Sequence, residues 1–370
     1  MTTRILLADD AMLVRQLLKD LLLEQADFSI AGEACNGREA VDLTVGLKPD
    51  LVIMDIVMPV MDGLEAIEEI MALSPTPVLV LSAAIEASEV DRAFLAIKRG
   101  ALDVMEKPEI GAPGALEDFA RRLVEKVRLL SGIRVIRHPR RKLRPPAPVE
   151  IASGGPGPTL LAIGASTGGP KAVMKLLKAL PPHFPGSVFV VQHIAPGFAA
   201  GFATWLNREC ALPVLIAAEG SRCLPGEVMV APDGSHMTLV EGRIRLVGAP
   251  PVNCCRPSID VFFNSLAQER CERVVGLLMT GMGKDGAQGL LHIRESGGTT
   301  MVQDESSCAV FGMPKVAIGL NAVDRVVPLD DLPDAIGKLF AKSKEPPFAT
   351  GGDAAIHSIR KDHDKGEQRE

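Results

Sequence analysis

Short aliphatic runs alternate with amphipathic stretches five times between residues 4 and 130. A short buried run followed by a helical pattern is typical of a strand and its crossover helix, and repetition of this unit indicates a doubly wound parallel sheet. We therefore expect an α/β domain over residues 1–131. Its expected strands are Arg4–Ala8, Phe28–Glu33, Leu51–Met54, Val78–Leu81 and Leu102–Met105. Its expected helices are Ala11–Glu24, Gly37–Leu47, Leu64–Leu73, Ser88–Arg99 and Gly114–Leu130.

A second α/β pattern covers residues 159–343. Four apolar runs predict strands at Leu160–Ile163, Val188–Gln192, Val214–Ala217 and Val274–Thr280. Two further runs, Glu227–Ala231 and Met237–Val247, resemble hairpin strands with a turn near Glu241 and Gly242. We therefore expect a doubly wound domain whose sheet is mixed and carries an antiparallel hairpin extension.

Two segments lack this periodicity. Residues 132–158 are first basic and then rich in Pro, Gly and Ala, which is typical of an extended linker. A docking strip for an acidic partner is the alternative interpretation. Residues 344–370 are polar, and we expect a disordered tail.

Composition limits the classes of function. The 370 residues suit two domains, and a formal net charge of −6 argues against a nucleic-acid binder. No apolar run approaches bilayer-spanning length, and no signal-peptide pattern opens the chain. The seven cysteines are odd in number and show no C-x-x-C spacing, so neither a disulfide framework nor a zinc site is indicated. We expect a cytoplasmic protein that is not inserted into a membrane.

Charged and polar residues follow the expected strands of the first domain. They are Asp9, Asp10, Asp55, Ser82 and Lys107. Because ligands bind at the carboxyl ends of parallel strands, these side chains should converge. Clustered carboxylates favour a hard cation such as Mg²⁺, which makes Asp55 the candidate phosphoryl acceptor, with Lys107 and Ser82 contacting the phosphoryl oxygens. Helix capping by the two adjacent aspartates is the simpler alternative, but it does not require the other three residues.

These residues carry a family resemblance. The segments ILLADD, VIMDIVMPVMDGLEAI, VLVLSA and MEKP resemble the receiver domain of two-component response regulators. The resemblance implies a flavodoxin-like (βα)5 fold and Mg²⁺ held by Asp10, Asp55 and the backbone carbonyl of Val57, with Asp9 assisting through water. Val104 stands where receivers often carry an aromatic residue, which argues against an aromatic-flip switch. Ala8 and Ala11 also depart from the frequent Val and Ser, with little expected effect.

Ser166 lies between an expected strand and an expected helix, in Gly164-Ala165-Ser166-Thr167-Gly168. This G-x-S-x-G pattern presents a nucleophilic hydroxyl at a sharp turn. Glycine-rich turns after strands also bind phosphate or simply reverse the chain. The motif alone therefore leaves a hydrolase and a binding loop about equally open.

A serine nucleophile needs a base and a carboxylate that orients the base. His193 is the one histidine that directly follows a buried strand, and Asp285 lies in the loop after the strand Val274–Thr280. The glycines that flank Met282 leave its backbone N–H free to serve as an oxyanion donor. The order Ser, His, Asp disfavours the α/β-hydrolase superfamily, in which the acid precedes the histidine. Competing acids remain open; they are Asp233, Asp260 and Asp304.

A wider resemblance covers nearly all of the chain except the linker and the tail. The segments IGASTGGP, VVQHIAPGF, PGEVMVAP, RPSIDVFFNSLA, TGMGKDGAQGL and QDESSCAVFGMPKVAI resemble the chemotaxis protein-glutamate methylesterases. The resemblance implies that Ser166 attacks γ-glutamyl methyl esters on chemoreceptors, with His193 as base, Asp285 as orienting acid and the Met282 N–H as oxyanion donor. It also implies deamidation of receptor glutamines, a chemotaxis histidine kinase as phosphodonor, inhibition by the unphosphorylated receiver, and no cofactor for the esterase reaction.

One departure lies beside the site residues. Cys255-Arg256-Pro257-Ser258 stands where the family usually reads His-Arg-Pro-Ser. We interpret Cys254 and Cys255 as buried packing, because the sequence pairs neither with a histidine. For Arg256, a contact with an acidic receptor surface and a structural ion pair are equally open. A regulator that only binds a partner, and an esterase of a non-motility pathway, are the competing functional hypotheses.

Overall fold

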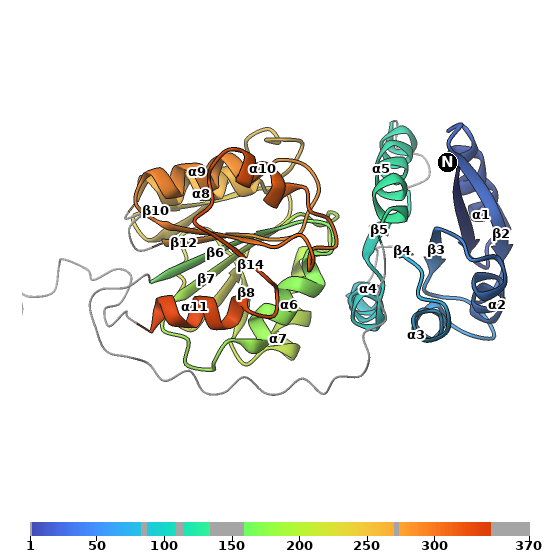
Figure 1. Ribbon diagram of the computed structural model, residues 1–370, viewed down its shortest axis with the longest axis horizontal. Coiled ribbons are helices and arrows are strands. Elements are labelled where there is room, and N and C mark those ends of the chain that lie inside the picture. Colours follow the sequence, from blue (N-terminus) through green and yellow to red (C-terminus); the bar gives the residue numbers. More distant parts are fainter. Residues whose placement is uncertain (1, 83–86, 109–113, 134–158, 270–273, 342–370) are drawn as a thin grey trace, which may run out of the picture.

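The computed structural model describes residues 2–82, 87–108, 114–133, 159–269 and 274–341 (Figure 1). These residues form two α/β units. Most of the expected linker and all of the expected tail lie outside the described residues, so the predictions about them stay untested.

The first unit is a five-stranded parallel sheet with the strand order β2-β1-β3-β4-β5. Its strands are β1 Thr3–Ala8, β2 Phe28–Ala34, β3 Leu51–Asp55, β4 Val78–Ser82 and β5 Asp103–Glu106. Its helices are α1 Met12–Leu23, α2 Gly37–Leu47, α3 Gly63–Leu73, α4 Ala87–Arg99 and α5 Ala115–Ser131. The expected elements are thus confirmed to within a few residues at each end.

Alternation along the strands decides which helices cover each face, because successive strand side chains point to opposite faces. Ile5 and Leu7 pack in one core with residues of α1 and α5. Leu6 and Ala8 pack in another with residues of α2, α3 and α4. Figure 1 shows these two helical layers on opposite sides of the first sheet.

The second unit is a seven-stranded sheet with the order β14-β13-β12-β6-β7-β9-β8, and each pairing within it is parallel. Its strands are β6 Leu160–Ala165, β7 Ser187–Gln192, β8 Val214–Ile216, β9 Val228–Val230, β12 Val274–Leu278, β13 Thr299–Gln303 and β14 Arg325–Val327. β6 lies between β7 and β12, so the chain reverses its direction of progress across the sheet there. Ligands bind at such a switch point in open α/β sheets.

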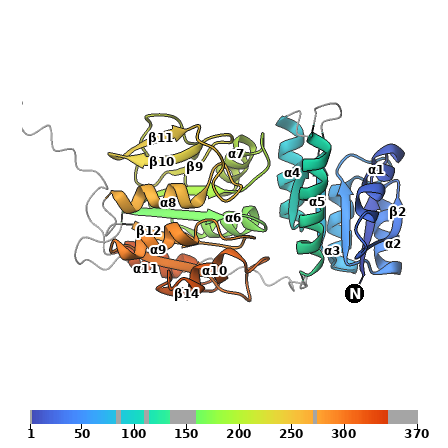
Figure 2. The ribbon, with the colours of Figure 1, turned by 90° about the horizontal axis from the view of Figure 1, so that it is seen from above.

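Helices cover both faces of the second sheet, as Figures 1 and 2 show. One layer consists of α6 Gly169–Ala179, α7 Ala199–Glu209 and α11 Leu332–Phe340. The other consists of α8 Ile259–Gln268, α9 Ala287–Glu295 and α10 Met313–Gly319. The doubly wound α/β prediction is therefore confirmed.

The expectation of a mixed sheet is wrong for the residues that the structure describes. The run around β9 pairs in parallel with β7 and β8 and is no hairpin strand. The hairpin itself exists as β10 His236–Val240 and β11 Arg243–Val247, but it forms a separate two-stranded sheet. Its turn is at Glu241 and Gly242, both with positive φ. A strand that is buried on both faces has a continuous apolar sequence. Such a sequence does not show whether the strand pairs in parallel or antiparallel with its neighbours.

The two units meet where α4 packs on α7. The Phe94 ring stacks on Trp205 with centroids 5.4 Å apart and also lies 5.6 Å from Phe202. Asp91 pairs with Arg208 at 2.8 Å, and Lys98 pairs with Glu209. The interface thus has a buried aromatic centre and a charged rim.

None of the described helices is long and apolar enough to cross a membrane.

Candidate active site

The turn after β6 holds Ser166 at the switch point of the second sheet. The Ser166 backbone N–H donates to the Thr280 carbonyl at 3.0 Å, and the Gly169 N–H donates to the Ser166 carbonyl at 2.7 Å. Gly168 has φ +75°, and a Cβ atom there would lie 2.5 Å from Ala309 Cβ. Only glycine therefore fits at this position, because a side chain would be strained at this φ and would also collide with Ala309. The half-buried Ser166 side chain stands just before the N-terminus of α6, where the helix dipole favours negative charge.

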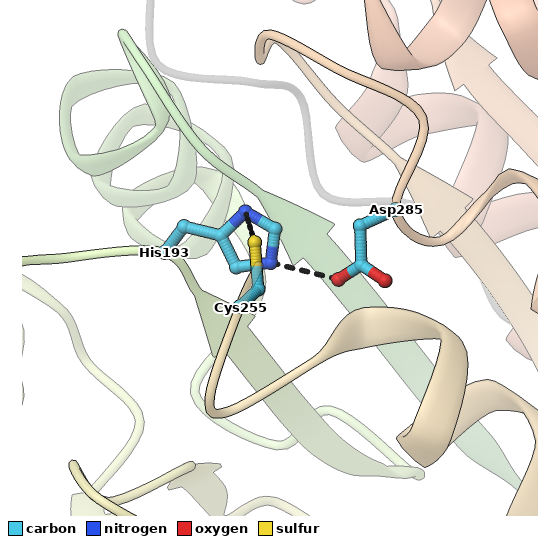
Figure 3. A group of neighbouring side chains, drawn as sticks. All are labelled: His193, Cys255 and Asp285. Atoms are coloured by element: carbon cyan, nitrogen blue, oxygen red, sulfur yellow. Dashed lines mark hydrogen bonds and ion pairs between the residues drawn. The ribbon is translucent and has the colours of Figure 1, made fainter. Parts of the chain in front are cut away.

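His193 directly follows β7 and lies next to this turn, since its N–H donates to the Ala165 carbonyl at 2.9 Å. Its ring Nε2 lies 2.9 Å from Asp285 Oδ2 (Figure 3). An ionised carboxylate at Nε2 selects the tautomer with the proton on Nε2, which leaves the lone pair on Nδ1. Within the described part of the chain no hydrogen bond joins the Ser166 hydroxyl to His193. Catalytic hydrogen bonds often form only with substrate bound.

Asp285 is buried and fully hydrogen-bonded. Besides the contact with His193, it accepts from Ser258 Oγ at 2.7 Å, from Asn253 Nδ2 at 2.9 Å and from the Ile259 N–H at 2.6 Å. Burial alone would raise the pKa of Asp285, but the hydrogen bond and charge of His193 and the neighbouring donors hold it below its ordinary value. The carboxylate therefore stays charged beside the imidazole.

The other candidate acids lie in different environments. Asp233 accepts from the Gly197 N–H at 2.9 Å and from the Ala199 N–H at 3.3 Å, at the start of α7. Asp304 accepts from the hydroxyls of Ser306 and Ser307. Asp260 is close to the site but bonds to the Gly289 N–H at 2.7 Å and to Asn253 at 2.8 Å. Of the four acids, Asp285 is the one that contacts His193.

The backbone of Gly281 and Met282 runs directly beside Ser166. A Cβ atom on Gly281 would lie 2.6 Å from Ser166 Cβ, so only glycine permits this approach. The Gly281 N–H donates to Val310, and the Gly281 carbonyl accepts from Gly312 and Met313. No hydrogen bond within the described ranges uses the Met282 N–H. The role of this N–H as an oxyanion donor stays a prediction.

Three residues that the sequence analysis missed support the site. Gln192 is buried, and its Nε2 donates to the carbonyls of both Ser166 and His193 at 2.8 Å. Asn253 bridges Asp260 and Asp285, and Ser258 donates to Asp285 while its oxygen caps the N-terminus of α8. The supporting role of Gln192 could have been predicted from its place as a polar residue at the end of an otherwise apolar strand.

Cys254 and Cys255 differ from their expected role. Cys254 is exposed, and Cys255 is half-buried with its Sγ 3.6 Å from His193 Nδ1 (Figure 3). Their interpretation as buried packing is therefore wrong for Cys254, and Cys255 does have a histidine neighbour. Arg256 donates to the Ala249 carbonyl at 3.4 Å and makes no ion pair with any described residue.

The acidic residues of the first unit also meet. Ligand oxygens of Asp9, Asp10 and Asp55 lie within 4.8 Å of one another. Lys107 Nζ lies 2.8 Å from Asp9 Oδ2 and 3.0 Å from Asp55 Oδ2. Burial raises the pKa of Asp55, and Lys107 opposes this only in part. Burial likewise opposes the charge of Lys107, but its bonds to the two carboxylates raise its pKa.

The last two predicted positions lie beside this cluster. Ser82 ends β4, is buried, and accepts from the Lys107 N–H through its carbonyl at 2.9 Å. Val57 follows β3 by two residues and is half exposed. The roles of the Ser82 hydroxyl and the Val57 carbonyl stay predictions. A set of carboxylate oxygens at the end of a parallel sheet fits Mg²⁺, which prefers hard oxygen ligands.

The fold and the sites together define a class: an ester hydrolase unit joined to a receiver unit. A CheB methylesterase family model matches residues 161–336, and a response regulator receiver domain model matches residues 5–116. The chain belongs to the CheB methylesterase family.

Curated relatives match this chain over most of their length. The chain is 45% identical to a protein-glutamate methylesterase/protein-glutamine glutaminase of Anaeromyxobacter dehalogenans (strain 2CP-C) over 339 residues, which cover 91% of this chain and 96% of the relative. It is 40% identical to one of Myxococcus xanthus (strain DK1622) over 345 residues, 92% of this chain and 98% of the relative. A solved structure of the Thermotoga maritima CheB methylesterase catalytic domain is also similar, with 34% identity, a TM-score of 0.48, and coverage of 49% of this chain and 98% of that one.

Proposed function

We propose that the chain hydrolyses γ-glutamyl methyl esters on chemoreceptors, deamidates receptor glutamines, and is restrained by its unphosphorylated receiver. The observation that carries the proposal is the His193–Asp285 pair at 2.9 Å, on the sheet edge where the Ser166 turn lies. The names of the relatives, protein-glutamate methylesterase and protein-glutamine glutaminase, support the choice of substrate.

Acylation begins when Ser166 Oγ attacks the ester carbonyl carbon. His193 Nδ1 takes the hydroxyl proton, because Nε2–H is engaged with Asp285. The charged carboxylate stabilises the imidazolium that forms. The Met282 N–H donates to the oxyanion, and the N-terminus of α6 adds a favourable dipole.

The imidazolium gives its proton to the leaving methoxide, and methanol departs, which completes acylation. In deacylation water attacks the acyl-enzyme and His193 takes a proton from it. The imidazolium then returns this proton to Ser166 Oγ, which leaves a free γ-carboxylate on the substrate. A glutamine side chain follows the same route with ammonia as the leaving group.

Control begins at the acidic cluster of the first unit. Asp55 would accept a phosphoryl group from a chemotaxis histidine kinase, and Asp10, Asp55 and the Val57 carbonyl would hold Mg²⁺ with Asp9 assisting through water. The cation supplies charge neutralisation for the phosphoryl oxygens. Lys107 and Ser82 would bind those oxygens, and Ser82 ends the strand that leads to α4. A change at Ser82 would therefore be transmitted to the helix that packs on α7.

The α4–α7 contact would restrain the esterase. α7 follows the His193 loop, and Phe198, at its N-cap, is buried against Phe94 with centroids 6.3 Å apart. Loosening this contact would shift the population toward an open state.

The six described cysteines are all free, which supports a cytoplasmic location.

Methanol release from methylated receptor membranes tests this proposal. We expect release by the wild type, stimulation by a small-molecule phosphodonor with Mg²⁺, and loss of release in Ser166→Ala. Asp55→Asn should keep the basal rate and lose the stimulation. Equal release by Ser166→Ala and wild type would refute the proposed chemistry.

A further inference from the structure

One side-chain amide lies between two buried carboxyl groups of the esterase unit. Asn253 Nδ2 donates to Asp260 Oδ2 at 2.8 Å and to Asp285 Oδ1 at 2.9 Å. Only 7% of Asp260 and 2% of Asp285 is exposed. An amide nitrogen carries two hydrogens, so each carboxyl group receives one of them. The amide of Asn253 therefore joins two acids in the interior of the unit.

The backbone conformation permits an asparagine at this position but does not require its amide. Asn253 and Cys254 have φ of +51° and +62°, in the left-handed region. Asparagine adopts this conformation more readily than most residues, and glycine adopts it with less strain still. The two hydrogen bonds to the carboxyl groups are what glycine could not supply.

The hydrogen bonds to Asp285 fix which of its oxygens faces His193. Oδ1 accepts from Asn253 Nδ2 and from Ser258 Oγ at 2.7 Å. Oδ2 accepts from the Ile259 N–H at 2.6 Å and lies 2.9 Å from His193 Nε2. With donors on both oxygens, the carboxylate cannot turn about its Cβ–Cγ bond without the loss of a hydrogen bond. Asn253 thus helps to set the direction of the contact with His193.

Asp260 is a buried acid that the proposed chemistry does not use. Burial raises the pKa of Asp260, and the charge of Asp285 adds to this effect. Hydrogen bonds from the Gly289 N–H at 2.7 Å and from Asn253 oppose it. Two carboxylates that share a site repel each other unless donors lie between them. The Asn253 amide is the donor that contacts both.

We propose that Asn253 is a positioning residue, which shares its NH₂ group between Asp260 and Asp285 and so keeps the second carboxylate directed at the imidazole that serves as the base. Asn253 acts on the reaction only through Asp285. Asp260 supplies the second charge that the amide has to balance. The effect on the rate rests on the proposed function, whereas the effect on the contact between Asp285 and His193 does not.

The substitution Asn253→Gly in the full-length protein removes the amide and keeps the backbone conformation, because glycine accepts positive φ. We expect kcat for methanol release to fall roughly 10- to 100-fold with little change in KM, because a hydrogen bond to a charged group is lost. The matched control is Asn321→Gly, which replaces an exposed asparagine at φ +55° after α10 and should keep the full rate. Circular dichroism verifies that each variant is folded.

The substitution Asp260→Asn separates positioning from a merely structural role. It places an NH₂ group opposite that of Asn253, so donor faces donor and kcat should fall as well. In the double variant with Asn253→Gly, this clash and the like charge are both removed. We expect the double variant to be faster than either single variant, with a coupling of roughly 2- to 150-fold. A role in folding alone would leave kcat of the folded variants unchanged.

Proton NMR tests the geometry without an assay of activity. The downfield resonance of the His193 Nε2 proton, assigned by its loss in Asp285→Asn, reports the contact between the two side chains. We expect this resonance in the wild type and in Asn321→Gly, and its weakening or loss in Asn253→Gly.

Two results would overturn the proposal: a resonance that Asn253→Gly leaves unchanged, and losses of kcat that simply multiply in the double variant. Methanol release by the wild type that does not depend on Ser166 would instead refute the proposed function. In that case the resonance would still decide whether Asn253 directs Asp285.

Discussion

Nε2 of His193 lies 2.9 Å from Oδ2 of Asp285, although the two residues are 92 positions apart in the chain. Both follow central parallel strands, β7 and β12, that flank β6. The turn after β6 carries Ser166, whose N–H bonds to the carbonyl of Thr280 beyond β12. The topology of the sheet therefore assembles the three side chains from separate parts of the sequence.

Asp285→Asn should lower kcat for methanol release by about 10³–10⁴-fold with little change in KM. The amide cannot stabilise the imidazolium, and it can turn its NH₂ toward Nε2 and select the wrong tautomer. The measurement is steady-state methanol release, with circular dichroism to verify folding. The matched control is Asp233→Asn, which changes an acid at the start of α7. A full-rate Asp285→Asn enzyme would rule out Asp285 as the orienting acid.

Ser258→Ala should lower the free energy of unfolding by about 1–2 kcal/mol. The Ser258 oxygen accepts from the Val261 N–H at 3.3 Å as the cap of α8, and its hydroxyl donates to buried Asp285 at 2.7 Å. Urea unfolding monitored by fluorescence of the single tryptophan measures the effect. Ser265 is the comparison, because its hydroxyl reaches only backbone groups at 2.7 and 3.0 Å. An unchanged urea midpoint in Ser258→Ala would contradict the capping role.

Asp55→Asn should raise stability at neutral pH. Burial raises the pKa of Asp55 in the folded protein, so its charge costs free energy above that pKa. This free-energy cost declines as the pH falls from the pKa of Asp55 in the folded protein toward its lower pKa in the unfolded chain. The stability difference between Asp55→Asn and the wild type should become smaller over the same pH range. Urea midpoints at neutral and acidic pH measure this, with the exposed Asp42→Asn as control. A variant less stable than wild type at neutral pH would show that the pairing with Lys107 outweighs burial.

The sequence predicts what depends on buried strands and strand ends. Asp9, Asp55 and His193 were found because they stand at the carboxyl ends of apolar runs, and Asp285 because it lies in the loop that leaves one; parallel strands bring their carboxyl ends together. The direction of β9 was not predictable, because a run buried on both faces is compatible with either pairing. Two strands were missed: β14 has three residues and is largely exposed, and β13 is buried but has only Met301 and Val302 as an apolar run between polar residues.

The supporting residues were beyond prediction for a different reason. Asn253 and Cys255 lie in an irregular segment, and no periodicity specifies where such a chain leads. Their contacts with Asp285 and His193 span 32 and 62 positions.

Gly201→Ala should raise methanol release in the absence of a phosphodonor. A Cβ atom on Gly201 in α7 would lie 2.1 Å from Val90 Cγ1 and 3.5 Å from Phe94 Cε2, both residues of α4. Its nearest neighbours therefore all belong to the receiver, so the added methyl group disturbs the contact between the units and not the esterase itself. Val90 is β-branched and buried, which leaves it little freedom to move aside.

Overpacking of this kind costs about 1–3 kcal/mol, which corresponds to a shift of about 5- to 150-fold between closed and open states. Stimulation by a phosphodonor should shrink in proportion, because the variant is already partly open. The control is Gly46→Ala in α2, where a new Cβ meets nothing within 4 Å. If Gly201→Ala released methanol no faster than Gly46→Ala without phosphodonor, the α4–α7 contact would not be the restraint, and control by Asp55 would have to act through another surface.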